Sequence, residues 1–128
     1  MAQFFTLHPD NPQERLVRQA ADIIRDGGVV VLPTDSCYAL VCALGDKKAM
    51  ERIIALRQLD LRHHFTLLCH NLSELGLYAK VDNSQFRLLK AATPGSYTFI
   101  LPATKEVPSR TLHPKRKTIG LRVPDHAI

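Results

Sequence analysis

The feature that most constrains this sequence is an unbroken apolar run, Val29–Leu32, followed by a proline and then by short polar side chains. β-favouring residues with no polar break predict a strand that is buried on both faces. Pro33 has no amide hydrogen to donate to a neighbouring strand, so it is expected to end the pairing. Thr34–Ser36 follow at once. Polar side chains at the end of a buried strand commonly form ligand sites in α/β sheets, and a simple Asx or Ser/Thr turn is the alternative.

A helix is predicted before this strand. Asn11 as N-cap, Pro12 at the first helical position and Glu14 two residues later are typical of a helix start. Apolar residues then recur at helical spacing as far as Ile24. Gly27-Gly28 predicts the left-handed turn that ends a helix. The helix therefore leads directly into the buried strand as one helix–strand unit.

Alternation, caps and breakers predict the remaining elements. They are a strand at Phe4–Leu7, a helix from about Lys47 to Arg57 capped by Asp46 with Ala49, Met50, Ile53, Ile54 and Leu56 facing inward, a strand at Phe65–Cys69, a helix from Leu72 to about Leu77 capped by Asn71, a helix from Asn83 to about Ala92 capped by Asp82, and strands at Tyr97–Leu101 and Thr118–Val123. Pro124–His126 then predicts the start of one more helix, two residues before the sequence stops. Because a layered sheet needs helices on both faces, we expect residues 1–128 to form the N-terminal portion of a longer single domain, with its C-terminal part missing.

Composition indicates a folded cytoplasmic protein. Of 128 residues 45% are hydrophobic and 23% charged, which is ordinary for a globular domain. No apolar run approaches membrane-spanning length, and charged residues precede any apolar core that a secretory signal would need. Three cysteines without CxxC spacing fit reduced thiols. The net charge of +5 is compatible with anionic partners, whereas 6% aromatic residues and no Trp disfavour a surface that stacks many bases.

Polar and basic side chains occur at three predicted strand ends. They are Thr34–Ser36, the connection Arg57–His64 with Cys69-His70 beyond the next strand, and Thr118 with Arg122. An arginine fork beside a hydroxyl donor suits phosphate or carboxylate recognition. The sequence contains neither a Walker loop nor a GxGxxG segment. Side chains are therefore expected to hold any nucleotide.

The same residues could also suggest other chemistries, but their spacing supports these less well. His63, His64, Cys69 and His70 could suggest a metal, but strand alternation sends Cys69 and His70 to opposite faces and no fourth ligand has a familiar spacing. Hence no metal site is predicted. A triad of Ser36, His64 and Asp35 lacks the GxSxG elbow that exposes a serine nucleophile. The basic run Lys115, Arg116 and Lys117 is more often a solvated turn than an RNA site, although RNA binding is the alternative.

Four segments resemble the YrdC/YciO family, in the family's order and across essentially the whole chain. Residues 33–40 resemble its PTDT-x-YGL segment, Arg57 the Arg of its KxR motif, residues 94–101 its PGPxTxIL segment and residues 118–126 its TVGxRxPxHP segment. The similarity is greatest to the YciO branch, through residues 4–5 with 8–12, residues 57–59, and residues 105–108 with 115–120.

This resemblance implies a fold and an activity. The implied fold is α/β: a mixed twisted sheet with helices on both faces, in a YrdC/RibB-like three-layer arrangement. Catalytic members make threonylcarbamoyl-adenylate from L-threonine, bicarbonate and ATP for the modification of adenosine in tRNA, with magnesium left open as a companion of ATP. Carried over by position, the threonine contacts are Ser36, Arg122 and His70 (or its neighbour Cys69), and the nucleotide contacts are Arg57, His64 and Thr118. Adenylation of this kind needs positioning and charge stabilisation more than a protein nucleophile.

The sequence departs from the family pattern at three places. Ala55 occupies the Lys position of KxR, the segment after Arg57 is altered, and the family's downstream Ser-x-Asn segment does not occur before the sequence stops. Loss of a cation beside reacting phosphates commonly costs orders of magnitude in rate. A module that binds tRNA, double-stranded RNA or nucleotide without synthase activity is therefore the alternative function, and we expect the 128-residue chain alone to be inactive. A truncated product without function is the third reading.

Overall fold

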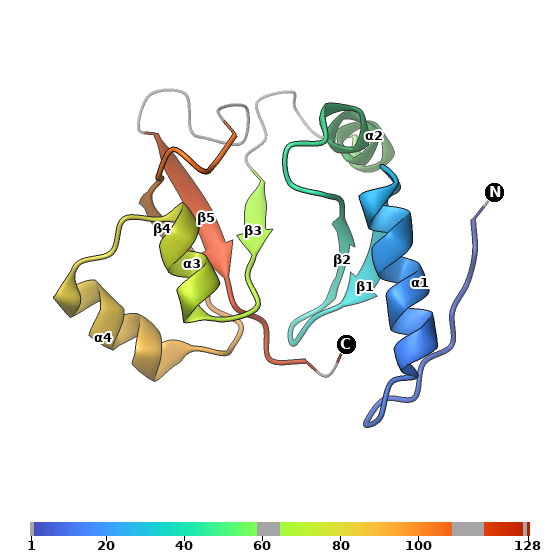
Figure 1. Ribbon diagram of the computed structural model, residues 1–128, viewed down its shortest axis with the longest axis horizontal. Helices are drawn as coiled ribbons and strands as arrows, with labels where there is room; N and C mark the ends of the chain where they lie inside the picture. The colour runs from blue at the N-terminus through green and yellow to red at the C-terminus, as the bar shows by residue number, and fades with distance from the viewer. Residues whose placement is uncertain (1, 59–64, 109–116, 127) are drawn as a thin grey trace. The chain divides into compact units, whose positions relative to one another are not determined.

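The computed structural model describes residues 2–58, 65–108, 117–126 and 128 (Figure 1). The chain divides into two compact units. Unit 1 comprises Met1–Arg57 with His126–Ile128, and unit 2 comprises Gln58–Asp125. The prediction that residues 1–128 form part of one longer domain stays a prediction.

Unit 1 is built around a two-stranded antiparallel hairpin. Strands β1 (Val30–Pro33) and β2 (Tyr38–Val41) pair from Val30 opposite Val41 to Pro33 opposite Tyr38. The first strand was expected to be buried on both faces, and this is wrong: Val31 is 59% exposed. An apolar run shows that its side chains tolerate burial, but whether both faces of the strand are covered depends on elements that pack over it from elsewhere in the chain. Here the partner of β1 is the segment immediately after it.

Two helices complete unit 1. Helix α1 (Glu14–Arg25) begins two residues later than predicted, with Gln13 rather than Asn11 at the N-cap position. The amide of Asn11 donates instead to Nδ1 of His8 (3.0 Å), so Asn11 belongs to the preceding turn. Gly27 ends the helix as expected, at φ 93°, a conformation that favours glycine.

The second helix of unit 1 follows its prediction more closely. Helix α2 (Lys47–Arg57) begins after Asp46, whose carboxylate accepts a hydrogen bond from the amide of Ala49 (3.1 Å). Met50 and Ile53 are buried as expected. Leu56 is 60% exposed, so its predicted inward orientation is wrong.

Two terminal segments differ from expectation. Phe4–Leu7 form no strand, and Phe4 is 93% exposed. Residues 124–126 are not helical. Both predictions rested on runs of a few residues, which cannot specify an element without a packing partner.

The described residues of unit 2 form two helices and a three-stranded mixed sheet. In chain order its elements are β3 (Thr66–Leu68), α3 (Leu72–Tyr78), α4 (Asn83–Ala92), β4 (Phe99–Pro102) and β5 (Thr118–Arg122). Strand β5 lies in the centre, parallel to β3 and antiparallel to β4. Asn71 caps α3 and Asp82 caps α4, as predicted, and Asp82 forms a reciprocal capping box with Gln85.

The helices of unit 2 pack on one face of this sheet. Leu75 from α3 and Leu89 from α4 join a buried cluster with alternate residues of β5, of which Leu121 is fully buried. Side chains on a strand alternate between faces, so the other residues of β5 face the opposite way. The mixed α/β class predicted from the sequence is confirmed.

The sheet face opposite the helices, called here the outer face, carries the side chains that concern function. Strand register and alternation place on it Thr66, Leu68, Thr98, Ile100, Thr118, Gly120 and Arg122. Thr66 and Thr98 are exposed, and Thr118 and Arg122 are half-buried. Hydroxyl groups and one guanidinium group are therefore presented together on a face whose backbone is held by two neighbouring strands.

Candidate functional site

Thr118 and Arg122 lie on the same face of β5, at its two ends. The register sets Arg122 opposite Leu68 of β3. Its carbonyl oxygen accepts a hydrogen bond from the amide of Cys69 (2.8 Å), and its Nε atom is shielded from solvent. The base of the arginine side chain is thus fixed by the sheet. A guanidinium group whose Nε is shielded from solvent suits a carboxylate or a phosphate, and Thr118 adds a hydroxyl at the other end of the same strand face.

His70 lies at the same edge of the sheet as Arg122. Strands β3 and β5 are parallel, so their carboxyl ends meet at one edge, and His70 follows Cys69 just beyond β3. His70 is exposed whereas Cys69 is 4% exposed, as the predicted alternation required. Of the two residues considered for threonine contact, only His70 is accessible to a ligand.

Ser36 lies in the turn that joins β1 to β2, in unit 1. The turn is closed by Thr34, whose hydroxyl donates to the carbonyl of Cys37 (2.6 Å) and accepts from the amide of Cys37 (3.3 Å). Thr34 is buried and Ser36 is exposed. The Ser/Thr turn considered as the simple alternative is therefore present, and it also presents the Ser36 hydroxyl to solvent.

Arg57 is an exposed residue at the end of α2. Helix α2 and the β1–β2 turn lie at opposite ends of the hairpin (Figure 1), so unit 1 does not place Arg57 beside Ser36. Ala55, at the Lys position of the family motif, is also exposed on α2. Which of Ser36 and Arg57 approaches Thr118 or Arg122 stays a prediction, because Thr118 and Arg122 belong to the other unit.

Several predicted positions fall outside the described residues. They are His63, His64, Lys115 and Arg116. Lys117 is described: it is exposed directly before β5, with φ 55°. The basic run is thus represented in the structure by this lysine alone, which neither supports nor opposes its assignment to RNA.

Burial disfavours the thiolate form of two cysteines, and the described part of the chain contains no metal site. Burial, followed by the nearby Glu74 carboxylate, raises the pKa of Cys69 to about 11. Burial and then Asp46 also raise the pKa of Cys42. Among the described residues no group of three or more His, Cys, Asp or Glu side chains could hold a metal ion. Cys69 acts as a protonated core residue.

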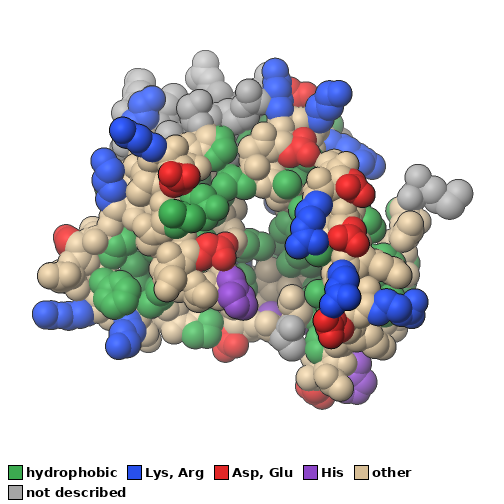
Figure 2. Space-filling view, in the orientation of Figure 1, with side chains coloured by type: hydrophobic (Ala, Val, Ile, Leu, Met, Phe, Trp, Pro, Cys, Tyr) green, Lys and Arg blue, Asp and Glu red, His purple; other side chains and the backbone are tan. Residues whose placement is uncertain are grey.

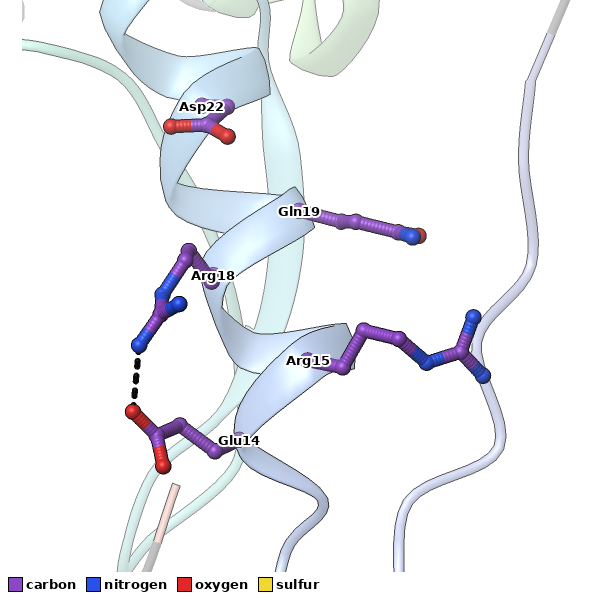
Figure 3. Close-up of a pocket in the computed structure, with 5 residues that line it drawn as sticks. All are labelled: Glu14, Arg15, Arg18, Gln19 and Asp22. Carbon is purple, nitrogen blue, oxygen red and sulfur yellow. Dashed lines mark hydrogen bonds and ion pairs between the residues drawn. The ribbon is translucent and has the colours of Figure 1, made fainter.

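A shallow depression on α1 is lined by Glu14, Arg15, Arg18, Gln19 and Asp22. Figure 3 shows that these side chains project outward from the helix, with Arg18 paired to Glu14. Arg25 pairs with Asp22 (3.2 Å), and Figure 2 shows basic and acidic side chains interleaved over α1. The depression is a charge-balanced helix surface and offers no concentrated field for a ligand. As to membranes, the described residues contain no helix with the length and apolarity required for a span.

The match to a known family decides the assignment. A sequence model named Sua5_yciO_yrdC and described as "Telomere recombination" matches residues 22–128. The chain belongs to the Sua5/YciO/YrdC family. The resemblance inferred from the four sequence segments is thereby confirmed.

Relatives of two kinds are similar to the chain. It is 62% identical to the uncharacterized protein YciO of Escherichia coli K12 over 128 residues, which is 100% of this chain and 62% of that protein. It is 32% identical to the threonylcarbamoyl-AMP synthase of Chromobacterium violaceum over 119 residues, 92% of this chain and 61% of that protein. The chain thus spans somewhat less than two thirds of the length of these relatives.

Solved structures similar to this chain belong to the same two kinds of relative. The crystal structure of E. coli YciO is similar with a TM-score of 0.94 at 62% identity, covering 99% of this chain and 62% of that one. The structure of P. abyssi Sua5 complexed with L-threonine has a TM-score of 0.82 at 27% identity, covering 91% of this chain and 34% of that one. The fold is that of the YciO and Sua5 proteins.

Proposed function

We propose that the chain binds L-threonine and ATP for chemistry of the threonylcarbamoyl-AMP synthase type, with bicarbonate as the third substrate and tRNA modification as its purpose. The observation that carries this proposal is the placement of Arg122 and Thr118 together on the outer face of β5. The same fold occurs in a Sua5 protein solved with L-threonine, and synthases are among the relatives.

In this proposal each side chain has a role suited to its chemistry. Arg122 binds the threonine carboxylate through its planar fork, and Ser36 and His70 contact the same amino acid. Arg57, His64 and Thr118 contact the nucleotide, and ATP brings magnesium if the phosphates need it. No protein nucleophile is required: the threonine amine adds to bicarbonate with loss of water, and a carbamate oxygen then displaces pyrophosphate from the α-phosphorus. The side chains contribute by positioning the reactants and stabilising negative charge.

A second candidate is favoured by one observation. Ala55 provides no cation where the family motif has a Lys, although its place on α2 is exposed and could carry one. A protein with this change could bind nucleotide, tRNA or double-stranded RNA through Arg57 and the basic run at Lys115, Arg116 and Lys117 without forming the adenylate. Phosphate contacts of this kind weaken as salt increases.

A calorimetric titration of the purified chain with L-threonine and ATP tests the proposal. We expect saturable binding of L-threonine. We expect no binding of D-threonine, because its inverted configuration does not match the arrangement of the contacting side chains. Pyrophosphate release that requires both threonine and bicarbonate would support synthase chemistry. Binding of ATP or tRNA without release would support the second candidate. If neither L-threonine nor ATP binds, the proposed function is wrong.

A further inference from the structure

The turn between β1 and β2 contains a buried hydroxyl group. Thr34 is 8% exposed, and it is the sole buried polar residue in the part of the chain that the structure describes. Burying a hydroxyl costs free energy unless its hydrogen-bonding groups are satisfied. The turn is already closed through the backbone, because the amide of Thr34 donates to the carbonyl of Cys37 (2.9 Å). A valine at this position would keep that bond, so closing the hairpin does not by itself require the hydroxyl.

The Thr34 hydroxyl instead organises the two residues at the end of the turn. Its Oγ1 atom donates to the carbonyl of Cys37 (2.6 Å) and accepts from the amide of Cys37 (3.3 Å). In a standard β-turn the fourth amide donates to the first backbone carbonyl, whereas here it donates to a side chain. Oγ1 also accepts from the amide of Ser36 (3.4 Å) and lies 3.4 Å from the Oγ atom of Ser36. One buried atom therefore contacts both the backbone and the side chain of Ser36.

We propose that Thr34 is a positioning residue for Ser36, an inference that rests on the proposed function. Ser36 is exposed, and in that function its hydroxyl contacts the bound amino acid. A serine on an exposed turn loses conformational freedom when it is ordered by a ligand, and this loss weakens binding. The contacts of Thr34 fix the backbone of Ser36 before the ligand arrives and so reduce the loss. Thr34 is itself buried, so it acts on the ligand through Ser36.

Titrations of the purified chain with L-threonine test the inference. Thr34→Val removes the hydroxyl and keeps the branched shape of the side chain. It should weaken L-threonine binding about fivefold, the typical value of one hydrogen bond. Thr34→Ser keeps the hydroxyl and should retain the wild-type affinity within about twofold.

A double-mutant cycle shows whether Thr34 acts through Ser36. Ser36→Ala removes the contacting hydroxyl and should also weaken L-threonine binding about fivefold. If Thr34 acts through this hydroxyl, Thr34→Val should weaken binding by less than about twofold when it is added to Ser36→Ala. A residue that only supports the fold would have the same effect in both backgrounds.

A matched control removes a threonine hydroxyl elsewhere. Thr104 belongs to unit 2, and its hydroxyl donates to the carbonyl of Leu77 (2.7 Å). Thr104→Val should leave L-threonine binding unchanged. Thermal melts should show that each variant is folded. If Thr34→Val unfolds the chain, the hydroxyl is required for the hairpin itself and the inference is wrong.

The outcomes separate this inference from the proposed function. If the wild-type chain binds L-threonine but Thr34→Val has no effect, or has the same effect with and without Ser36→Ala, the inference is wrong and the proposed function stands. If the wild-type chain binds ATP but no L-threonine, the inference is again wrong. If it binds neither, the inference and the proposed function are both wrong.

Discussion

Replacing Leu121 with alanine is expected to lower the free energy of unfolding by about 3 kcal/mol. Leu121 is 0% exposed and lies on the central strand, opposite Leu67 of β3 and Phe99 of β4. Its side chain joins the cluster that includes Leu75 and Leu89 from the two helices. The substitution removes buried methyl groups and leaves a cavity that strands held on both sides cannot close. Urea unfolding followed by circular dichroism measures the loss.

Ile100→Ala is the matched control for this prediction. Ile100 belongs to the neighbouring strand β4 but lies on the outer face, 73% exposed. Its truncation should cost no more than about 0.5 kcal/mol, the usual range for surface substitutions. Equal losses for the two variants would contradict the assignment of the sheet's two faces, because burial would then not separate them.

Arg122→Gln is expected to weaken L-threonine binding at least about thirtyfold, the effect of losing about 2 kcal/mol of a charge-assisted contact. Glutamine keeps a hydrogen-bond donor but lacks the positive charge and the paired N–H donors of the guanidinium group. Arg122→Lys should recover part of the affinity, since it restores charge without the planar geometry. Isothermal titration calorimetry at constant salt gives the three dissociation constants.

An arginine far from the outer face provides the control. Arg87 is exposed on α4, a helix that packs on the opposite side of the sheet. Arg87→Gln changes the net charge by the same amount, so it reports any general loss of attraction for an anion. Should Arg87→Gln and Arg122→Gln weaken binding equally, the effect would be one of net charge and not of a site at Arg122.

Local signals in the sequence predicted the helices of unit 2 well. Asn71 and Asp82 accept hydrogen bonds from amides three residues later, at Glu74 and Gln85, and this pattern is complete within four residues. The errors concern features that depend on distant partners. Val31 is exposed because burial of a strand's face depends on the element that packs over it, which the apolar run does not specify. Phe4 is likewise exposed, because residues 4–7 pair with no strand in the described part of the chain.

Only part of the candidate site could be predicted, because some of its geometry depends on strands that are distant in the sequence. Alternation along one strand is enough to place Thr118 and Arg122 on a common face, and the resemblance to the family named both. The other side chains of the outer face, among them Thr66 and Thr98, could not be placed from the sequence, because their positions depend on the register of three strands that are far apart in the chain.

The most direct test of a ligand site on the outer face is a titration of the ¹⁵N-labelled chain with L-threonine, followed by amide chemical shifts. A ligand site on this face predicts that the largest shifts occur in Thr66–Leu68 and Thr118–Arg122, with saturation at a single dissociation constant. Amides of α1, including the depression around Arg15 and Gln19, should not move. Saturable shifts confined to α1 or α4, with β3 and β5 unchanged, would contradict it.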